Sequence, residues 1–216
     1  MDDLNDFVDD LPHKLKIEVS LFLHEDTYTK IEFLNKRSKS FIAWACPLLK
    51  PFLNPENQYI YFEGDDITCM YFLKGGNCGF VLPKHRNIKY IDIHVGGYFG
   101  LIDIVGSIFS RDIQFNDWIQ YKDILRRQFS VMSQTNCDLL MLPIHDLNKM
   151  RWEFLEAYEG LFQNAYNRLN RALKVKLHAI KFCKKNPPET LDKKQLQQLQ
   201  GKILPTITPK KIDEEQ

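Results

Sequence analysis

Short runs of aromatic and β-branched residues fill the middle of the chain and restrict it most strongly to a β fold. The runs lie at 59–62, 70–73, 79–82, 90–93, 129–132 and 137–142. Turn-forming residues separate most of them, as in the glycine-containing segments 63–66 and 75–77. Strands this short at this spacing are typical of antiparallel barrels and jelly rolls. The pattern therefore predicts a β-roll.

Helical patterns lie on both sides of this central region. Residues 11–19 and about 29–45 carry apolar side chains at helical spacing, and prolines follow the second stretch. After Pro143, an apolar stripe at helical intervals continues to Ile180. A stripe this long predicts a bend near 154–157, which would divide it into two helices.

The chain therefore divides into four parts. Residues 1–54 are the N-terminal helical part, 55–145 the β-roll with an insert at about 105–125, 146–186 the C-terminal helices and 187–216 a flexible tail. The predicted fold class is α+β. An antiparallel β jelly-roll barrel is flanked by N-terminal helices and by a C-terminal pair of helices.

Composition argues against several classes of partner. The net charge of +1 gives no support for a nucleic-acid partner. No run approaches the roughly 18 consecutive apolar residues of a membrane span. The five cysteines are an odd number without C-x-x-C spacing, which indicates buried thiols in a reducing compartment.

Catalytic and metal signatures are also missing from the sequence. There is no G-x-S-x-G, no G-K-[ST] loop and no Cys/His nucleophile pattern, so we do not expect an enzyme. The six histidines lack paired ligand spacing, so we expect no metal site.

Two motifs are more specific than the strand pattern. Residues 59–73 read YIYFEGDDITCMYFL, and residues 96–103 read GGYFGLID, followed at 126–131 by RRQFSV. They resemble a strand pair and the phosphate-binding cassette of cyclic-nucleotide-binding domains. The resemblance is nearest to cyclic-nucleotide-gated, hyperpolarization-activated and related voltage-gated potassium channels. It extends from about Leu11 to Lys176, and the order of helices, roll and two helices also recurs in that fold.

The resemblance gives the flanking helices roles. It implies that 11–19 corresponds to part of the helical C-linker, which joins the pore to the binding domain in those channels. It also implies that 165–172 belongs to a lid helix that folds over bound nucleotide.

The same resemblance implies a pocket for cAMP or cGMP, with no cofactor required. Gly100 matches the position where the backbone approaches the ligand, and the helix that begins at Leu101 and Ile102 would present its N-terminus to the phosphate. Arg127 is our preferred phosphate arginine, since a guanidinium holds a diffuse anion well. Arg111 is the alternative, because it falls almost at the family's spacing after Gly100.

Three further residues complete the candidate pocket. Gln128 follows the arginine and can donate a hydrogen bond, Ile91 would face a purine, and Arg168 lies on the lid helix. The alternatives are that Ile91 is ordinary core and that Arg168 lies on a solvated helix face.

Several positions depart from the family pattern. Leu101 replaces a Glu that accepts a hydrogen bond from the ribose, a loss of about 1–3 kcal/mol in binding. Gln128 and Phe129 replace Thr-Ala, and Asp103 would repel an anion unless an arginine neutralises it. The aromatic-rich insert at 105–125 would plug the pocket, cover it or loop out. We therefore expect a degenerate site.

The leading hypothesis is a regulatory domain of a cation channel, with potassium as the expected ion, at the cytosolic face of a membrane or in the cytoplasm. Its partners would be the remainder of a channel polypeptide or neighbouring subunits, without a direct membrane span in this chain. The alternative is a free-standing interaction or adaptor subunit that uses a retired cyclic-nucleotide-binding fold in a larger assembly.

Overall fold

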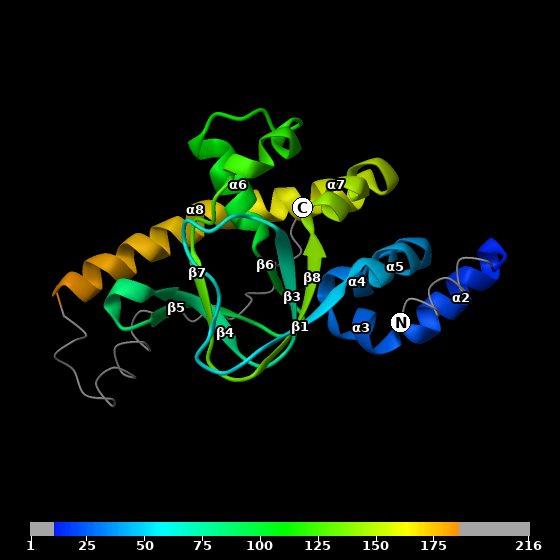
Figure 1. The fold of residues 1–216 in the computed structure, drawn as a ribbon, viewed down its shortest axis with the longest axis horizontal. Helices are drawn as coiled ribbons and strands as arrows, with labels where there is room; N and C mark the ends of the chain where they lie inside the picture. The colour runs from blue at the N-terminus through cyan, green and yellow to red at the C-terminus, as the bar shows by residue number, and fades with distance from the viewer. Residues whose placement is uncertain (1–10, 186–216) are drawn as a thin grey trace, which may run out of the picture.

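The structure is a computed structural model that describes residues 11–185 (Figure 1). The predicted flexible tail at 187–216 lies outside the described residues. N-terminal helices extend to one side of a β-roll, and a long C-terminal helix crosses the roll. The N-terminal elements are α2 (His13–Leu23), α3 (Glu25–Lys30), α4 (Glu32–Asn35), α5 (Lys39–Ala45) and the short 3₁₀ helix η1 (Cys46–Leu48).

Eight strands form the roll. They are β1 (Lys50–Asn54), β2 (Tyr59–Tyr61), β3 (Cys69–Gly75), β4 (Cys78–Leu82), β5 (Ile88–Ile93), β6 (Tyr98–Phe99), β7 (Ser130–Ser133) and β8 (Cys137–Pro143). They pair antiparallel in two four-stranded sheets, ordered β1-β8-β3-β6 and β2-β7-β4-β5. The predicted α+β fold with a jelly roll flanked by helices is confirmed. The roll consists of two sheets and is not a single closed barrel.

Two strands were not predicted. Strand β1 lies inside the range 1–54 that the sequence predicts as helical, and it contains Pro51. Its place at the edge of its sheet explains how the proline is tolerated, because an edge strand has one side without a ladder partner. Strand β6 has only two residues, too few to show an alternating pattern.

The predicted helix over 29–45 is divided in the structure. Ile31 has an extended backbone between α3 and α4, and α5 starts afresh after Ser38. The Ser38 hydroxyl accepts a hydrogen bond from the backbone N–H of Phe41 at 3.2 Å, which is an ordinary N-terminal cap. Local capping therefore decides this boundary in a stretch whose apolar spacing alone predicts one helix.

The C-terminal helices divide where the sequence predicts. Helix α7 (Ile144–Glu153) and helix α8 (Leu155–Lys185) are separated by Phe154. The Phe154 ring packs against Phe41 at 5.1 Å and Trp44 at 5.2 Å between ring centroids, so this break joins the C-terminal helices to α5. No helix among residues 11–185 has both the length and the apolar character needed to cross a bilayer.

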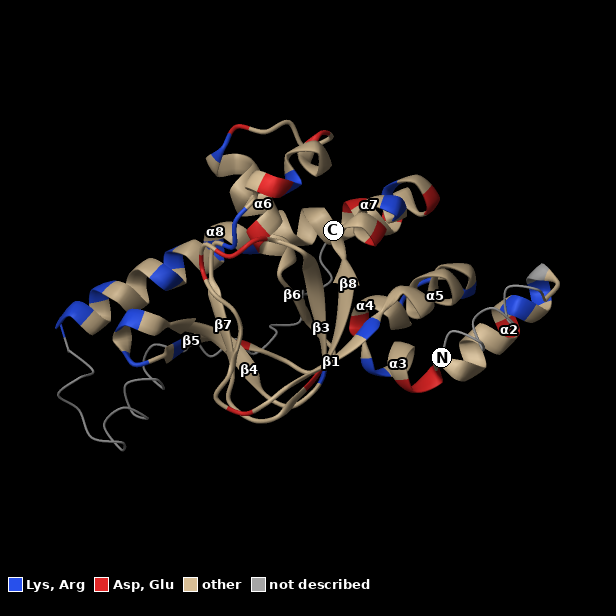
Figure 2. Cartoon of the chain, in the orientation of Figure 1, with Lys and Arg blue, Asp and Glu red and all other residues tan. Residues whose placement is uncertain are grey.

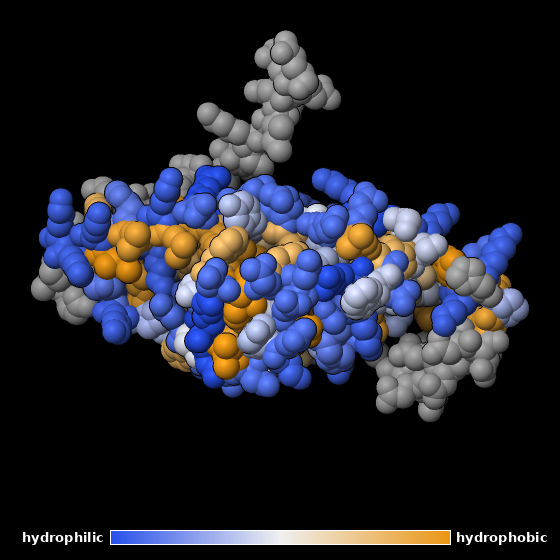
Figure 3. Space-filling view, turned by 90° about the horizontal axis from the view of Figure 1, so that it is seen from above, coloured by the Kyte–Doolittle hydropathy of each residue, from blue (hydrophilic) through white to orange (hydrophobic). Residues whose placement is uncertain are grey.

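Helix α8 has two different faces. Small and aliphatic residues such as Ala165, Leu169 and Ala172 are buried, whereas Tyr166 and Leu177 stay exposed. Figure 3 shows an apolar row over this part of the molecule, bordered by hydrophilic side chains. Lys and Arg gather along the distal half of α8 (Figure 2), where they complement the helix dipole.

The insert packs against α8. It comprises the C-terminal part of α6 (Leu101–Ser110) and the 3₁₀ helix η3 (Trp118–Ile124) with the residues between them. Trp118 is fully buried, and its indole N–H donates to the Tyr158 hydroxyl at 2.8 Å. Phe115 meets Phe162 edge-on at 5.0 Å. The aromatic residues of the insert therefore fix it to helix α8.

All five cysteines of the chain are buried thiols, as the sequence predicted. Burial raises the pKa of the Cys46 thiol to about 12 and that of Cys78 still further. Because the thiolate is the reactive form, native protein at pH 8 should react with less than one equivalent of Ellman's reagent, and denatured protein with five. Rapid reaction of several thiols without denaturant would contradict this burial.

Candidate functional site

The cassette begins at a glycine turn between β6 and α6. Gly100 has φ of +91°, a left-handed conformation that other residues adopt at a cost, and it precedes the first turn of α6. Leu101 and Ile102 are buried in the core at the start of this helix. The N-terminus of α6 is therefore packed inside the molecule.

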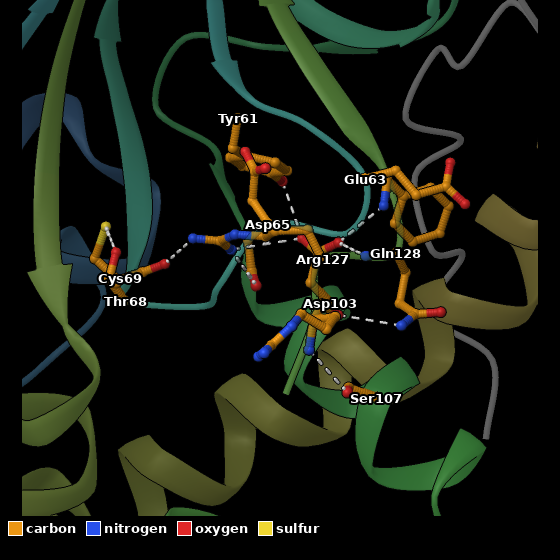
Figure 4. A network of polar contacts seen from close by, with 12 residues as sticks. Tyr61, Glu63, Asp65, Thr68, Cys69, Asp103, Ser107, Arg127 and Gln128 are labelled. Atoms are coloured by element: carbon orange, nitrogen blue, oxygen red, sulfur yellow. Dashed lines mark hydrogen bonds and ion pairs between the residues drawn. The ribbon is translucent and has the colours of Figure 1, made fainter. Parts of the chain in front are cut away.

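Arg127 points into the same region from the residues that precede β7. Its side chain is only 1% exposed. The guanidinium donates to the backbone carbonyl of Cys69 at 2.6 Å and to that of Gly100 at 3.2 Å (Figure 4). The phosphate arginine preferred from the sequence thus connects strand β3 to the cassette turn through internal contacts.

Asp103 supplies the negative charge beside this guanidinium. It is fully buried, and its Oδ2 lies 3.6 Å from Nη1 of Arg127. Its Oδ1 accepts hydrogen bonds from the backbone N–H groups of Gln128 at 2.7 Å and Phe129 at 3.1 Å. The Tyr61 hydroxyl donates to Oδ2 at 2.9 Å. One carboxylate therefore connects α6, β2 and the residues before β7.

Aromatic rings enclose the guanidinium of Arg127. Its central carbon lies 4.1 Å from the ring centroid of Tyr61 and 5.7 Å from that of Tyr71. Tyr71 in turn stacks on Phe99, with centroids 5.2 Å apart. Contact with ring faces stabilises a cation that water no longer solvates. The arginine is thus buried among parts of the protein, and only its Nε atom has no hydrogen-bond partner among the described residues.

The charges of this network favour one another. Burial raises the pKa of Asp103, while Arg127, the two backbone amides and Tyr61 oppose that shift. Burial lowers the pKa of Arg127, but its neighbours, with Tyr61 and Asp103 first among them, together outweigh burial and raise it. Arg127 and the two backbone N–H groups can only donate, so three of the four groups that contact this carboxyl favour its ionised form. We assign an ion pair of Arg127 and Asp103.

Helix α8 meets the cassette through Lys176. Its ammonium donates to the backbone carbonyl of Gln128 at 2.8 Å and to the Glu63 carboxylate at 2.7 Å. It also lies 5.2 Å from the ring centroid of Phe129. Phe129 is fully buried and packs edge-on against Phe80 at 5.2 Å. The residue that replaces the family's alanine therefore fills space between β4 and α8.

The remaining predicted residues differ in where they lie. Gln128 is part of the cassette, and its side chain donates to the carbonyl of Arg126, whereas Ile91 is buried in β5 opposite Phe80. Arg168 is exposed and makes a long 3.5 Å contact with the carbonyl of Tyr98. Arg111 follows the last residue of α6, roughly 15 Å along the helix from Gly100. The structure brings together Gly100, Leu101, Ile102, Arg127 and Gln128, but not Arg111 or Arg168.

Sequence reasoning missed Tyr61 and Lys176 altogether. No local pattern pairs residue 61 with residue 103, since the contact depends on how β2 and α6 meet in the fold. Asp103 did carry a signal: it is a lone acid in the otherwise apolar start of a helix, and buried acids are nearly always paired.

No family model matches the chain, but curated relatives do, and two of these are channel subunits. The cyclic nucleotide-gated channel cone photoreceptor subunit alpha of Gallus gallus is 26% identical over 159 residues, covering 74% of this chain and 20% of the relative. The cyclic nucleotide-gated channel alpha-3 of Homo sapiens is 26% identical over 151 residues, covering 70% and 20%. The chain thus spans about a fifth of the length of these relatives. The predicted resemblance to this class of channel is confirmed.

The solved structures that resemble the chain include one of much lower identity. A protein from Geobacter metallireducens described as a cyclic nucleotide-binding protein shares 10% identity, with a TM-score of 0.47, over 66% of this chain and 91% of that chain. At this level the likeness adds nothing to the sequence relationship.

We expect that breaking the Arg127–Asp103 pair destabilises the protein strongly. Asp103→Ala should lower the free energy of unfolding in urea by about 3–5 kcal/mol, because it leaves a guanidinium buried without its anion. Arg111→Ala, at an exposed position, should change it by no more than about 0.5 kcal/mol. In a double-mutant cycle, the variant that carries both Asp103→Ala and Arg127→Met should lose less free energy of unfolding than the sum of the losses in the two single variants. Additive effects would contradict the pairing.

A matched pair of glycines tests the close approach at the cassette turn. An alanine Cβ at Gly100 would lie 2.9 Å from Nη1 of Arg127, whereas one at Gly64 would meet nothing within 4 Å. Both glycines have positive φ, +91° and +94°, so the backbone strain is matched. Gly100→Ala should therefore lower the thermal midpoint more than Gly64→Ala does. The difference between the two variants in free energy of unfolding should be at least about 1 kcal/mol. Equal shifts would argue against the tight contact.

Proposed function

We propose that this chain is the cytosolic regulatory domain of a cation channel and that it carries a degenerate cyclic-nucleotide site. Similarity to two channel subunits over 70% or more of the chain supports the channel context. Because the chain spans about a fifth of those relatives, the pore would lie in the remainder of the polypeptide. The role of this domain is regulatory and not catalytic.

The observation that carries the degenerate site is the internal anion of Arg127. A cyclic phosphate bound to this arginine would have to displace Asp103, which already lies 3.6 Å from the guanidinium. Asp103 is fully buried, so the displaced carboxylate would remain close to the phosphate or force the helix start to move. Repulsion between two poorly solvated anions costs far more than at a surface. The protein's own carboxylate thus takes the place that the resemblance gives to the phosphate.

Contacts on the α8 side of the cassette support the same conclusion. Phe129 is fully buried against Phe80, and Lys176 already bonds to Gln128 and Glu63. A ligand between α8 and the roll would have to break the two hydrogen bonds of Lys176. Helix α8 therefore holds its place on the roll without a nucleotide.

Regulation in this form depends on contacts with other parts of the channel. A domain shifts gating only if some partner binds one arrangement of its helices better than another. Helix α2 exposes Leu15, Phe22 and Leu23, which suit the remainder of the polypeptide or neighbouring subunits as partners. Potassium is the ion we propose for the channel, on the sequence resemblance alone.

Calorimetric titration tests the proposed site. We expect no saturable heat with cAMP or cGMP up to millimolar concentration, because the Asp103 carboxylate already pairs with the guanidinium of Arg127. Circular dichroism of the same sample must show a folded protein. Micromolar binding that Arg127→Ala abolishes and Arg111→Ala leaves intact would refute the degenerate site and make Arg127 the phosphate anchor.

The adaptor hypothesis is distinguished by a different observation. A membrane-spanning region encoded upstream in the same transcript would support the channel proposal. A short open reading frame that encodes only this domain would support a free-standing subunit.

A further inference from the structure

A second basic site lies outside the cassette, in a cleft of about 380 Å³. Its walls come from α4 and the turn before α5, from β6 and from α8. Three cationic side chains line it, and Glu32 is the only acidic residue among its lining residues. The cationic residues are Lys36, Arg37 and Arg168.

Arg37 is the most unusual of the three. It is half-buried, with its guanidinium carbon 4.8 Å from the ring centroid of Phe33. Its Nε atom is buried without a hydrogen-bond partner among the described residues. On the other side, its Nη2 lies 3.3 Å from the position that a Cβ at Gly160 would occupy, so the guanidinium reaches α8. A buried N–H group ordinarily has an acceptor.

Arg168 borders the same space from α8. It makes a long 3.5 Å contact with the carbonyl of Tyr98, and its guanidinium carbon lies 5.7 Å from the Tyr98 ring centroid. The rings of Phe33 and Tyr98 are 6.1 Å apart. Two guanidinium groups thus rest on neighbouring rings.

The influences on the pKa of Tyr98 agree with this placement of the two arginines. Burial raises the pKa of Tyr98, whereas Arg168 and, less strongly, Arg37 lower it. Both positive charges therefore lie close to the same side chain, from opposite sides of the cleft.

Several cations near the roll and the cassette have anions, whereas the three cleft cations have none within the described residues. Arg127 pairs with Asp103, and Lys176 pairs with Glu63. Lys30 and Lys74 share Asp26. Within residues 11–185, no salt bridge involves Lys36, Arg37 or Arg168. Unbalanced positive charge beside a cleft raises the local concentration of anions.

We propose that this cleft binds a small phosphate-bearing anion. Guanidinium forks bind phosphate oxygens in pairs, and the flexible Lys36 would add a third charge-assisted contact at the rim. The bound anion would give Arg37 its missing acceptor and would join α8 to the turn between α4 and α5. It would fasten the lid helix to the N-terminal helices without using the cassette.

The test is calorimetric titration of the full chain with pyrophosphate, against sodium chloride at matched ionic strength. We expect saturable binding that weakens about tenfold or more in Arg37→Gln and in Arg168→Gln, because each removes a charge-assisted hydrogen bond. Arg171→Gln is the control: this residue is exposed on the same helix, three positions from Arg168, and does not line the cleft. Arg168 is exposed, so its variant tests the site even if Arg37→Gln fails to fold.

Three outcomes decide the proposal. Loss of binding in both cleft variants with an unchanged Arg171→Gln supports the site. No saturable binding overturns it. Equal weakening in all three variants also overturns it, in favour of general charge attraction.

A second arm uses phosphatidylcholine vesicles with and without a phosphoinositide. Vesicle binding with the same variant pattern supports the site with a lipid headgroup as the source, and pyrophosphate binding alone supports it with a soluble phosphate. The cassette proposal does not depend on any of these results.

Discussion

The buried ion pair of Arg127 and Asp103 is the interaction on which the centre of this structure depends. Arg127 contacts backbone carbonyls of β3 and of the turn before α6, while Asp103 contacts β2 and the residues before β7. Elements distant in sequence thus converge on two charges. A buried pair gives little net stability compared with a well-packed apolar pair, but removal of one partner is costly. The pair therefore fixes the arrangement of the roll more than it adds to its stability.

The same pair changes the chemistry of the cassette. An arginine that is available to a ligand must exchange water for phosphate, whereas Arg127 is 1% exposed and already has an anion. Leu101 adds a second obstacle, because a buried aliphatic side chain cannot accept a hydrogen bond from a ribose hydroxyl. In the function proposed above, a fold that resembles a cyclic-nucleotide-binding domain makes the polar contacts of its cassette within the protein.

Helix α8 connects the separate parts of the molecule. On one side it bonds to the cassette through Lys176, and on another it holds the aromatic insert through Tyr158 and Trp118. Arg168, further along the helix, borders the basic cleft beside the N-terminal helices. A helix with three such contacts can transmit a change at one of them to the others, provided that a partner prefers one of its positions.

The sequence by itself determined the order of elements and most of the strands, because alternating aromatic runs and glycine turns are local signals. It also determined the break at Phe154 and the presence of Arg127 and Asp103 near the cassette. It could not place β1, whose Pro51 is tolerated only at a sheet edge, or the insert, whose four aromatic residues fit several paths. Only the tertiary structure decided that Asp103 faces Arg127 and that Tyr61 and Lys176 complete the site. Those contacts join residues 24 to 113 positions apart, and such distances are set by how the strands and helices pack, not by any local pattern.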